Sequence, residues 1–128
     1  MQLDSLPFAK LMGVTVVSVA PDLVIGELNV REELCTRPAV LHGGAYMAFA
    51  DTIGAVATVA NLKEGETTTT IESKTNFFAA IPLGDTARAE CTALHKGRTT
   101  MVWQTKITRG DGRLAALVTQ TQMVLKRA

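Results

Sequence analysis

The chain has 128 residues, which is close to the commonest size of one folded domain and too short for two domains with separate cores. Hydrophobic residues make up 47% of it and charged residues 20%, a balance that excludes global disorder. Thirteen Lys and Arg oppose twelve Asp and Glu, so the net charge of +1 is too small to drive sequence-independent binding to nucleic acid or an anionic membrane. We therefore expect one domain over residues 1–128, with neither nucleic acid nor membrane as its partner.

Two cysteines are too few for a disulfide framework, and the two histidines show no metal-ligand spacing with them. Residues 1–7 lack the basic and then apolar pattern of a secretory signal, so the expected location is cytoplasmic. The apolar segment 43–61 is long enough to raise the question of a membrane span, but it carries Asp51 at its middle. A carboxylate is costly in mid-bilayer, which favours a helix buried in protein.

The first elements are predicted from turn residues and β-branched runs. A short helix is expected over residues 5–13, with Ser5 as its N-cap and a glycine at its end. Residues 14–20 and 23–30 are β-branched runs separated by a Pro-Asp turn, which predicts a hairpin. The polar segment 31–42 ends near an Arg-Pro pair that disfavours a regular strand, so a loop is expected there.

The rest of the chain predicts a helix followed by strands. Residues 43–61 are rich in Ala and apolar on every face of a 3.6-residue helix, so protein should surround this helix on all sides. After this helix, small residues alternate with polar ones within residues 85–95, which leaves room for the helix against the sheet. The predicted fold is α+β, with a curved antiparallel sheet of five or six strands wrapped around one long central helix. The four strand-like stretches are 67–79, 85–95, 98–109 and 113–125, and the inward residues of the second are Ala87, Ala89, Cys91 and Ala93.

Asp51 is the residue that most needs a functional reason. It is the only ionisable side chain besides Tyr46 in segment 43–61. Removing a carboxylate from water costs several kcal/mol unless the group is paired, and such carboxylates concentrate at functional sites. The structural alternative is that Asp51 bonds to neighbouring Thr52 or to the backbone and serves only packing.

His42, Gly43 and Gly44 open the same helix, where the first backbone N–H groups lack intrahelical partners. Glycine lets a ligand approach the backbone, so the Gly43 N–H could hold a developing oxyanion. The alternative is a plain helix start with His42 as its cap. Gly43 and Asp51 are separated by about 12 Å of helical rise and about 80° of rotation, so they cannot meet at one carbon within a single chain. If both are catalytic, the site combines two subunits, which predicts a two-fold dimer with two equivalent sites.

Other catalytic schemes find no motif in this chain. No serine lies in a G-x-S-x-G elbow, neither cysteine has a catalytic motif around it, and no phosphate-binding or dinucleotide fingerprint occurs. A carboxylate that acts on a polarised carbonyl remains. Residues 88–128 hold eight basic and two acidic side chains, a bias that favours a small phosphorylated ligand.

Five motifs follow one another between residues 35 and about 125. They are Leu41-His-Gly-Gly-Ala-Tyr-Met-Ala-Phe-Ala-Asp51, Thr70-Ile-Glu-Ser-Lys-Thr-Asn-Phe77, Pro82-Leu-Gly84, His95-Lys-Gly-Arg-Thr99 and Gly110-Asp-Gly-Arg-Leu-Ala115. In this combination they resemble the hotdog-fold acyl-CoA thioesterases of the PaaI-like group, named after phenylacetic acid degradation.

The resemblance implies hydrolysis of an aryl- or medium-chain acyl-CoA to the free acid and CoA, without a metal or redox cofactor. It implies that Asp51 acts either as general base on water or as nucleophile, two roles that stay open. It further implies that the Gly43 N–H polarises the thioester carbonyl, that His42 orients the substrate and that Thr70 helps to place the carboxylate or the water.

The resemblance also implies substrate contacts and an assembly. Gly44 lies where the substrate would approach the helix, and the turn of Gly97, Arg98 and Thr99 resembles the region that meets CoA. Thr36 stands where the family often has Asn or Gln, which implies lower activity or a different acyl preference. A homodimer with shared sites is expected, assembled further into a homotetramer. The alternatives are a non-catalytic acyl-CoA-binding module and, less favoured, a hydratase.

Overall fold

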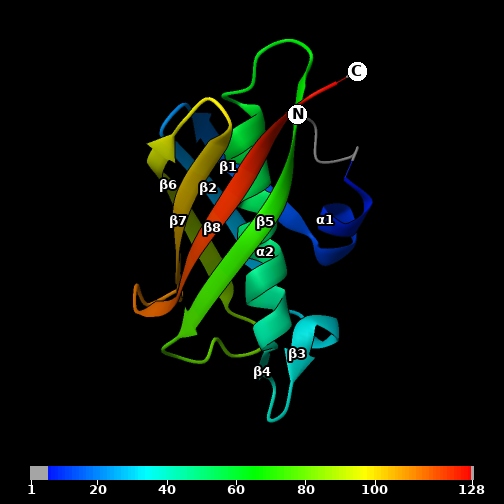
Figure 1. Ribbon diagram of the computed structural model, residues 1–128. Helices are drawn as coiled ribbons and strands as arrows, with labels where there is room; N and C mark the ends of the chain where they lie inside the picture. Colours follow the sequence, from blue (N-terminus) through cyan, green and yellow to red (C-terminus); the bar gives the residue numbers. More distant parts are fainter. Residues whose placement is uncertain (1–5, 128) are drawn as a thin grey trace.

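The structure is a computed structural model that describes residues 6–127 (Figure 1). Six strands form one antiparallel sheet in the order β1-β2-β6-β7-β8-β5, and this sheet wraps around helix α2. A separate two-stranded sheet pairs β3 with β4 beside the start of α2. The elements are α1 (Pro7–Met12), β1 (Val14–Ala20), β2 (Leu23–Asn29), β3 (Cys35–Thr36), β4 (Val40–Leu41), α2 (Gly43–Val59), β5 (Glu66–Phe77), β6 (Thr86–Lys96), β7 (Thr100–Thr108) and β8 (Leu114–Lys126).

The predicted antiparallel sheet around one central helix is confirmed, and its strands lie within two residues of their predicted bounds. The prediction of a strandless loop over 31–42 is wrong, because β3 and β4 pair across a turn that contains Pro38. Helix α1 has Leu6 as its N-cap residue, and the predicted cap Ser5 lies outside the described residues. Within residues 6–127, no helix is both long and apolar enough to cross a membrane.

Close approach between α2 and the sheet depends on small residues in the strands. Ala87, Ala89 and Cys91 of β6 are fully buried, as the alternation predicted. On β2, a Cβ at Gly26 would overlap the fully buried side chain of Ile53, so glycine is needed for this contact. Burying a large apolar side chain of this kind contributes about 1.5–3 kcal/mol. The inward face of α2 is therefore fixed against the sheet.

The outward face of α2 is only partly covered, which corrects the prediction of a helix surrounded on all sides. Gly44, Ala48, Asp51 and Ala55 follow the i, i+4, i+7 and i+11 positions of one helical line, and none of them is fully buried. Strand β5 lies at the edge of the sheet and pairs only with β8. An apolar sequence alone could not show that a single chain leaves this helical line and this strand edge open.

Candidate active site

The carboxylate of Asp51 is held from two strands. Thr70 on β5 donates its hydroxyl proton to Asp51 Oδ1 at 2.6 Å, and Gln120 on β8 donates from Nε2 to the same oxygen at 3.3 Å. Thr52 does not bond to Asp51, since its hydroxyl donates to the carbonyl oxygen of Ala48 at 2.9 Å. Asp51 is partly exposed and lies on the partly covered line of α2, while the buried Gln120 and the half-buried Thr70 both donate to the same carboxylate oxygen.

A buried layer of polar side chains lies behind this contact. Gln122 donates from Nε2 to Thr70 Oγ1 at 2.6 Å, and its Oε1 lies 3.0 Å from Thr68 Oγ1. Gln120 and Gln122 are 0% and 1% exposed, which is unusual for glutamine. Buried amides of this kind require hydrogen-bond partners, and here those partners lead to Asp51.

His42 is the N-cap of α2, as one of the two sequence interpretations expected. Its Nδ1 accepts the Gly44 N–H at 2.8 Å, and its carbonyl oxygen accepts the Ala45 N–H at 2.9 Å. A neutral imidazole that accepts at Nδ1 carries its proton on Nε2, so the exposed ring presents a donor to solvent. No acceptor within residues 6–127 meets the Gly43 N–H. The cap therefore leaves free the N–H that the oxyanion interpretation needs.

The loop between β5 and β6 fixes the first turn of α2. Tyr46 donates its phenol proton to the carbonyl oxygen of Ala79 at 3.0 Å, and the Leu41 N–H donates to that of Ile81 at 2.8 Å. Burial raises the pKa of the Tyr46 phenol, so the group stays protonated and remains a donor. On the other side of the loop, Arg109 donates to the carbonyl oxygen of Ala80 at 3.3 Å.

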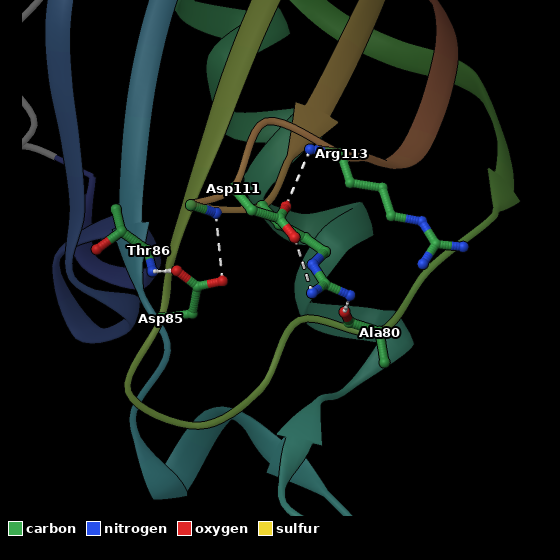
Figure 2. A network of polar contacts seen from close by, with 7 residues as sticks. Ala80, Asp85, Thr86, Asp111 and Arg113 are labelled. Carbon is green, nitrogen blue, oxygen red and sulfur yellow. Dashed lines mark hydrogen bonds and ion pairs between the residues drawn. The ribbon is translucent and has the colours of Figure 1, made fainter.

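Figure 2 shows the polar contacts that hold the neighbouring turn between β7 and β8. Asp85 accepts the Gly110 N–H at 3.2 Å, while Asp111 accepts the Arg113 N–H and an Arg109 N–H, both at 3.0 Å. The Arg113 N–H is the main cause of a lowered pKa for the Asp111 carboxyl, with Arg109 contributing further. These exposed contacts fix loop positions and contribute little to global stability. They therefore hold the loop between β5 and β6, which supports the start of α2, in one position.

A cavity of about 430 Å³ opens between α1, the segment before β3 and the start of α2. Its volume falls within the range of small-molecule binding sites. The lining is mostly apolar and places one imidazole and one thiol among aliphatic and aromatic side chains: Phe8, Leu11, Leu34, Cys35, His42 and Ala48. Gly44 also lines it, so the cavity reaches the same helix start as the free Gly43 N–H.

The predicted CoA-binding turn lies at the opposite end of α2. Lys96 Nζ, at the end of β6, is 3.4 Å from Asn61 Oδ1, just beyond the last residue of the helix. Because α2 has 17 residues, this turn is about 25 Å from the helix start, and Asp51 lies halfway between them. Arg98 and Gly97 line a second cavity of about 380 Å³ there.

Comparison with known proteins gives the family. Residues 39–116 match the family model described as the thioesterase superfamily. The chain belongs to this superfamily. It is 29% identical over 117 residues to a 1,4-dihydroxy-2-naphthoyl-CoA hydrolase from Listeria monocytogenes, which covers 91% of this chain and 94% of the relative.

Solved structures show the same fold. A thioesterase from Haemophilus influenzae is 25% identical, has a TM-score of 0.89 and covers 98% of this chain and 92% of its own. A mutant of the phenylacetic acid degradation protein PaaI from Thermus thermophilus is 24% identical, has a TM-score of 0.85 and covers 93% of this chain and 99% of its own. The hotdog fold is confirmed, and the resemblance to PaaI is confirmed at the level of the fold. Thioester hydrolysis is the activity class of this chain.

The structure of this thioesterase divides the predicted site residues into separate groups. Asp51 and Thr70 are hydrogen-bonded, while His42, Gly43 and Gly44 lie together at the helix start. Thr36 is exposed on β3 and does not line the 430 Å³ cavity. The turn of residues 97–99 meets neither group within one chain.

Sequence reasoning missed Gln120 and Gln122, although a signal was present. Ala116, Val118, Gln120 and Gln122 share one face of β8, and all four are buried. Two amides at the end of an otherwise apolar strand face need hydrogen-bond partners inside the protein. Applied to residues 113–125, the alternation that identified the inward face of β6 would have singled them out.

Proposed function

We propose that this chain hydrolyses an aryl- or medium-chain acyl-CoA to the free acid and CoA, with Asp51 as general base or nucleophile. The observation that carries the proposal is the carboxylate of Asp51, held at Oδ1 by Thr70 and open to solvent along one line of α2. The Listeria relative is named for an aromatic acyl-CoA, which supports the aryl half of this substrate class.

Both roles of Asp51 give the same products. As a base, the carboxylate would take a proton from water as the water oxygen attacks the carbonyl carbon, and the C–S bond then breaks to release CoA. As a nucleophile, it would displace CoA to form a mixed anhydride, which water then hydrolyses. Each route passes through an oxyanion, for which the free Gly43 N–H is the matching donor. In this proposal the Nε2–H of His42 would orient the same carbonyl, and neither route requires a metal or redox cofactor.

The site we propose is completed by a second subunit, because Gly43 and Asp51 of one chain are about 12 Å apart along α2. Strand β5 has an unpaired edge, and its Ile71 side chain is 53% exposed. Thr70 lies near the middle of this strand, while Phe77 at its end packs beside Gly43. Antiparallel pairing of two β5 edges, centred near Ser73, would bring the partner's Phe77 and the start of its α2 opposite Asp51.

The same two-fold arrangement gives the distant turn a role in binding CoA. When the helices of two subunits are antiparallel, the turn of residues 97–99 at the end of one α2 approaches the start of the other. Lys63, Lys96 and Arg98 line the cavity at this turn together with Glu66, and Lys96 is ion-paired with Asp22. The excess of positive charge in the lining suits the phosphates of CoA. A homodimer with two shared sites is the unit we propose, and two such dimers would form the expected homotetramer.

A panel of aryl-, short-, medium- and long-chain acyl-CoAs tests this function. We expect loss of the thioester absorbance with aryl- and medium-chain substrates, faster than with the short and long ones, since the cavity at the helix start is apolar and about 430 Å³ in volume. Isothermal titration with the same panel measures binding, and so distinguishes a thioesterase from a binding module that is not catalytic. Binding without hydrolysis of any substrate would contradict the proposal.

Cysteine labelling tests whether the acyl group occupies this cavity. Cys35 lines the cavity, whereas Cys91 is fully buried, and burial raises the pKa of the Cys91 thiol to about 11. We expect iodoacetamide to modify Cys35 in the native protein and Cys91 only after unfolding. An acyl-CoA bound to the Asp51→Asn variant at ten times its Kd should slow Cys35 labelling about tenfold. An unchanged rate of Cys35 labelling with bound acyl-CoA would mean that the acyl group lies elsewhere. The Cys35→Ser variant is the control that identifies which cysteine is labelled.

A further inference from the structure

We infer that Gln120 and Gln122 of β8 are positioning residues for the reaction at Asp51. They hold Oδ1 of the carboxylate, Gln120 directly and Gln122 through Thr70, so that Oδ2 is the oxygen that reacts. This inference rests on the proposed function, because it assigns a task to residues that do not touch the substrate. Four observations carry it.

The direction of the hydrogen bonds is fixed along the indirect route. Gln122 Nε2 donates to Thr70 Oγ1 at 2.6 Å, so the Thr70 oxygen acts as an acceptor in this contact. A hydroxyl has a single proton, and that of Thr70 is therefore directed to Asp51 Oδ1, also at 2.6 Å. The Gln122 amide is itself oriented by Thr68, whose Oγ1 lies 3.0 Å from Gln122 Oε1. Gln122 thus determines that Thr70 donates to the carboxylate.

Gln120 has an arrangement that packing alone does not explain. Its side chain is fully buried, Nε2 donates to Asp51 Oδ1 at 3.3 Å, and Oε1 has no partner within residues 6–127. A buried carbonyl oxygen without a donor lowers stability, and an apolar side chain of similar shape would avoid that cost. Residues kept at a cost in stability are typical of functional sites.

Gly54 provides the space that Gln120 occupies. A Cβ at Gly54 would overlap the side-chain amide of Gln120, so only glycine lets the amide lie against this turn of α2. Gly54 is in the helix interior, where glycine is less favourable than alanine. It comes three residues after Asp51, and the two residues therefore lie on neighbouring turns. Gly54 and Gln120 both lower stability, and together they place a donor on Asp51.

The result is an asymmetric carboxylate. Both side-chain donors end on Oδ1, and no donor among residues 6–127 meets Oδ2. Asp51 lies on the partly open line of α2. Fixing one oxygen restricts rotation of the carboxylate and holds the other oxygen in one position, which is the preorganisation that a base or nucleophile needs.

The Gln120→Met variant tests the direct contact. Methionine keeps the approximate volume but removes the donor and the unpaired oxygen, so we expect kcat to fall about tenfold with KM changed by less than about twofold. The melting temperature should stay unchanged or rise, whereas a purely structural role would lower it. The matched control is Gln104→Met on the outward face of β7, which should leave both kcat and stability unchanged.

A double-mutant cycle tests the role of Gly54. Gly54→Ala should displace the Gln120 amide and lower kcat about as much as Gln120→Met does. In a Gln120→Ala background the space is empty, so Gly54→Ala should lower kcat no further. Independent and additive effects of the two substitutions on kcat would contradict the inference.

Two failures can be told apart by combining these data with Asp51→Ala. If Asp51→Ala hydrolyses acyl-CoA as fast as the unmodified chain, the proposed function is wrong. If Asp51 is essential while Gln120→Met keeps its full kcat, only the positioning role is wrong. An NMR readout does not depend on turnover: Asp51→Ala should shift the side-chain amide signals of Gln120 and leave those of Gln104 in place. Unmoved Gln120 signals would overturn the inference.

Discussion

The Asp51→Ala variant is expected to lower kcat for acyl-CoA hydrolysis about a hundredfold or more, the scale on which a positioned base or nucleophile contributes to a reaction. Thr70 would keep its place on β5 and Gln120 its place on β8, because the pairing of these two strands holds them and the carboxylate does not. The fold and the assembly should therefore be retained. The measurement is steady-state loss of thioester absorbance, together with the melting temperature and the molar mass of the variant.

The Asp51→Asn variant separates chemistry from binding. Its side-chain oxygen can still accept from Thr70 and Gln120, while the other position becomes an amide that can neither take a proton nor attack a carbonyl. Substrate affinity should persist as turnover is lost. Glu90→Ala is the matched control, since Glu90 is an exposed carboxylate on β6 whose ion pair with Arg88 contributes little. Unchanged turnover in Asp51→Ala would remove Asp51 from the mechanism.

The fold could be predicted because its local signals agree with one another. Turn residues separate every pair of long strands, and the alternation of Ala87, Ala89 and Cys91 with polar residues indicates one buried face of β6. The length and apolar character of segment 43–61 then leave only one element to cover that face. Register and strand order follow from tertiary pairing, and this is why β5 at the sheet edge, beside β8, could not be derived from local pattern.

The site could be predicted only where its chemistry is unusual for its surroundings. Asp51 is conspicuous because it is an acid in an apolar helix. The glycines at positions 43 and 44 are conspicuous because a helix begins with them. Gln120 lies 69 residues from its partner Asp51 and Gln122 lies 52 from Thr70, so no spacing rule connects them. The open line of α2 was also missed, because small apolar residues on an uncovered helix face look the same in the sequence as residues that pack on the chain's own sheet.

Gly43→Pro is the second substitution with a large expected effect, a fall in kcat of about a hundred- to a thousandfold, as for loss of one oxyanion donor. Proline removes the N–H and suits the first position of a helix. His42 has φ −63° and ψ 139°, a conformation that residues before proline prefer, so α2 should still begin at the same place. Gly43→Ala is the matched control, because it keeps the N–H and its Cβ would lie 3.4 Å from Phe77 Cζ, an ordinary contact. Equal losses in the two variants would indicate a steric effect and contradict the donor role.

Mixing the two inactive variants determines whether the site is shared. If the Gly43 N–H of one subunit works with Asp51 of the other, a heterodimer of Gly43→Pro and Asp51→Ala chains contains one intact site and one site that lacks both groups. Random pairing of equal amounts should then restore about a quarter of the unmodified activity, from parents that are each nearly inactive. Joint unfolding and refolding ensures exchange, and a mass tag on one chain confirms it. A mixture that contains heterodimers yet stays as inactive as its parents would contradict a site shared between two chains. Within one chain, the eight residues between Gly43 and Asp51 span about 12 Å of helical rise, too far for both groups to reach a single reacting carbon. With that result, Gly43 and Asp51 could not both be catalytic.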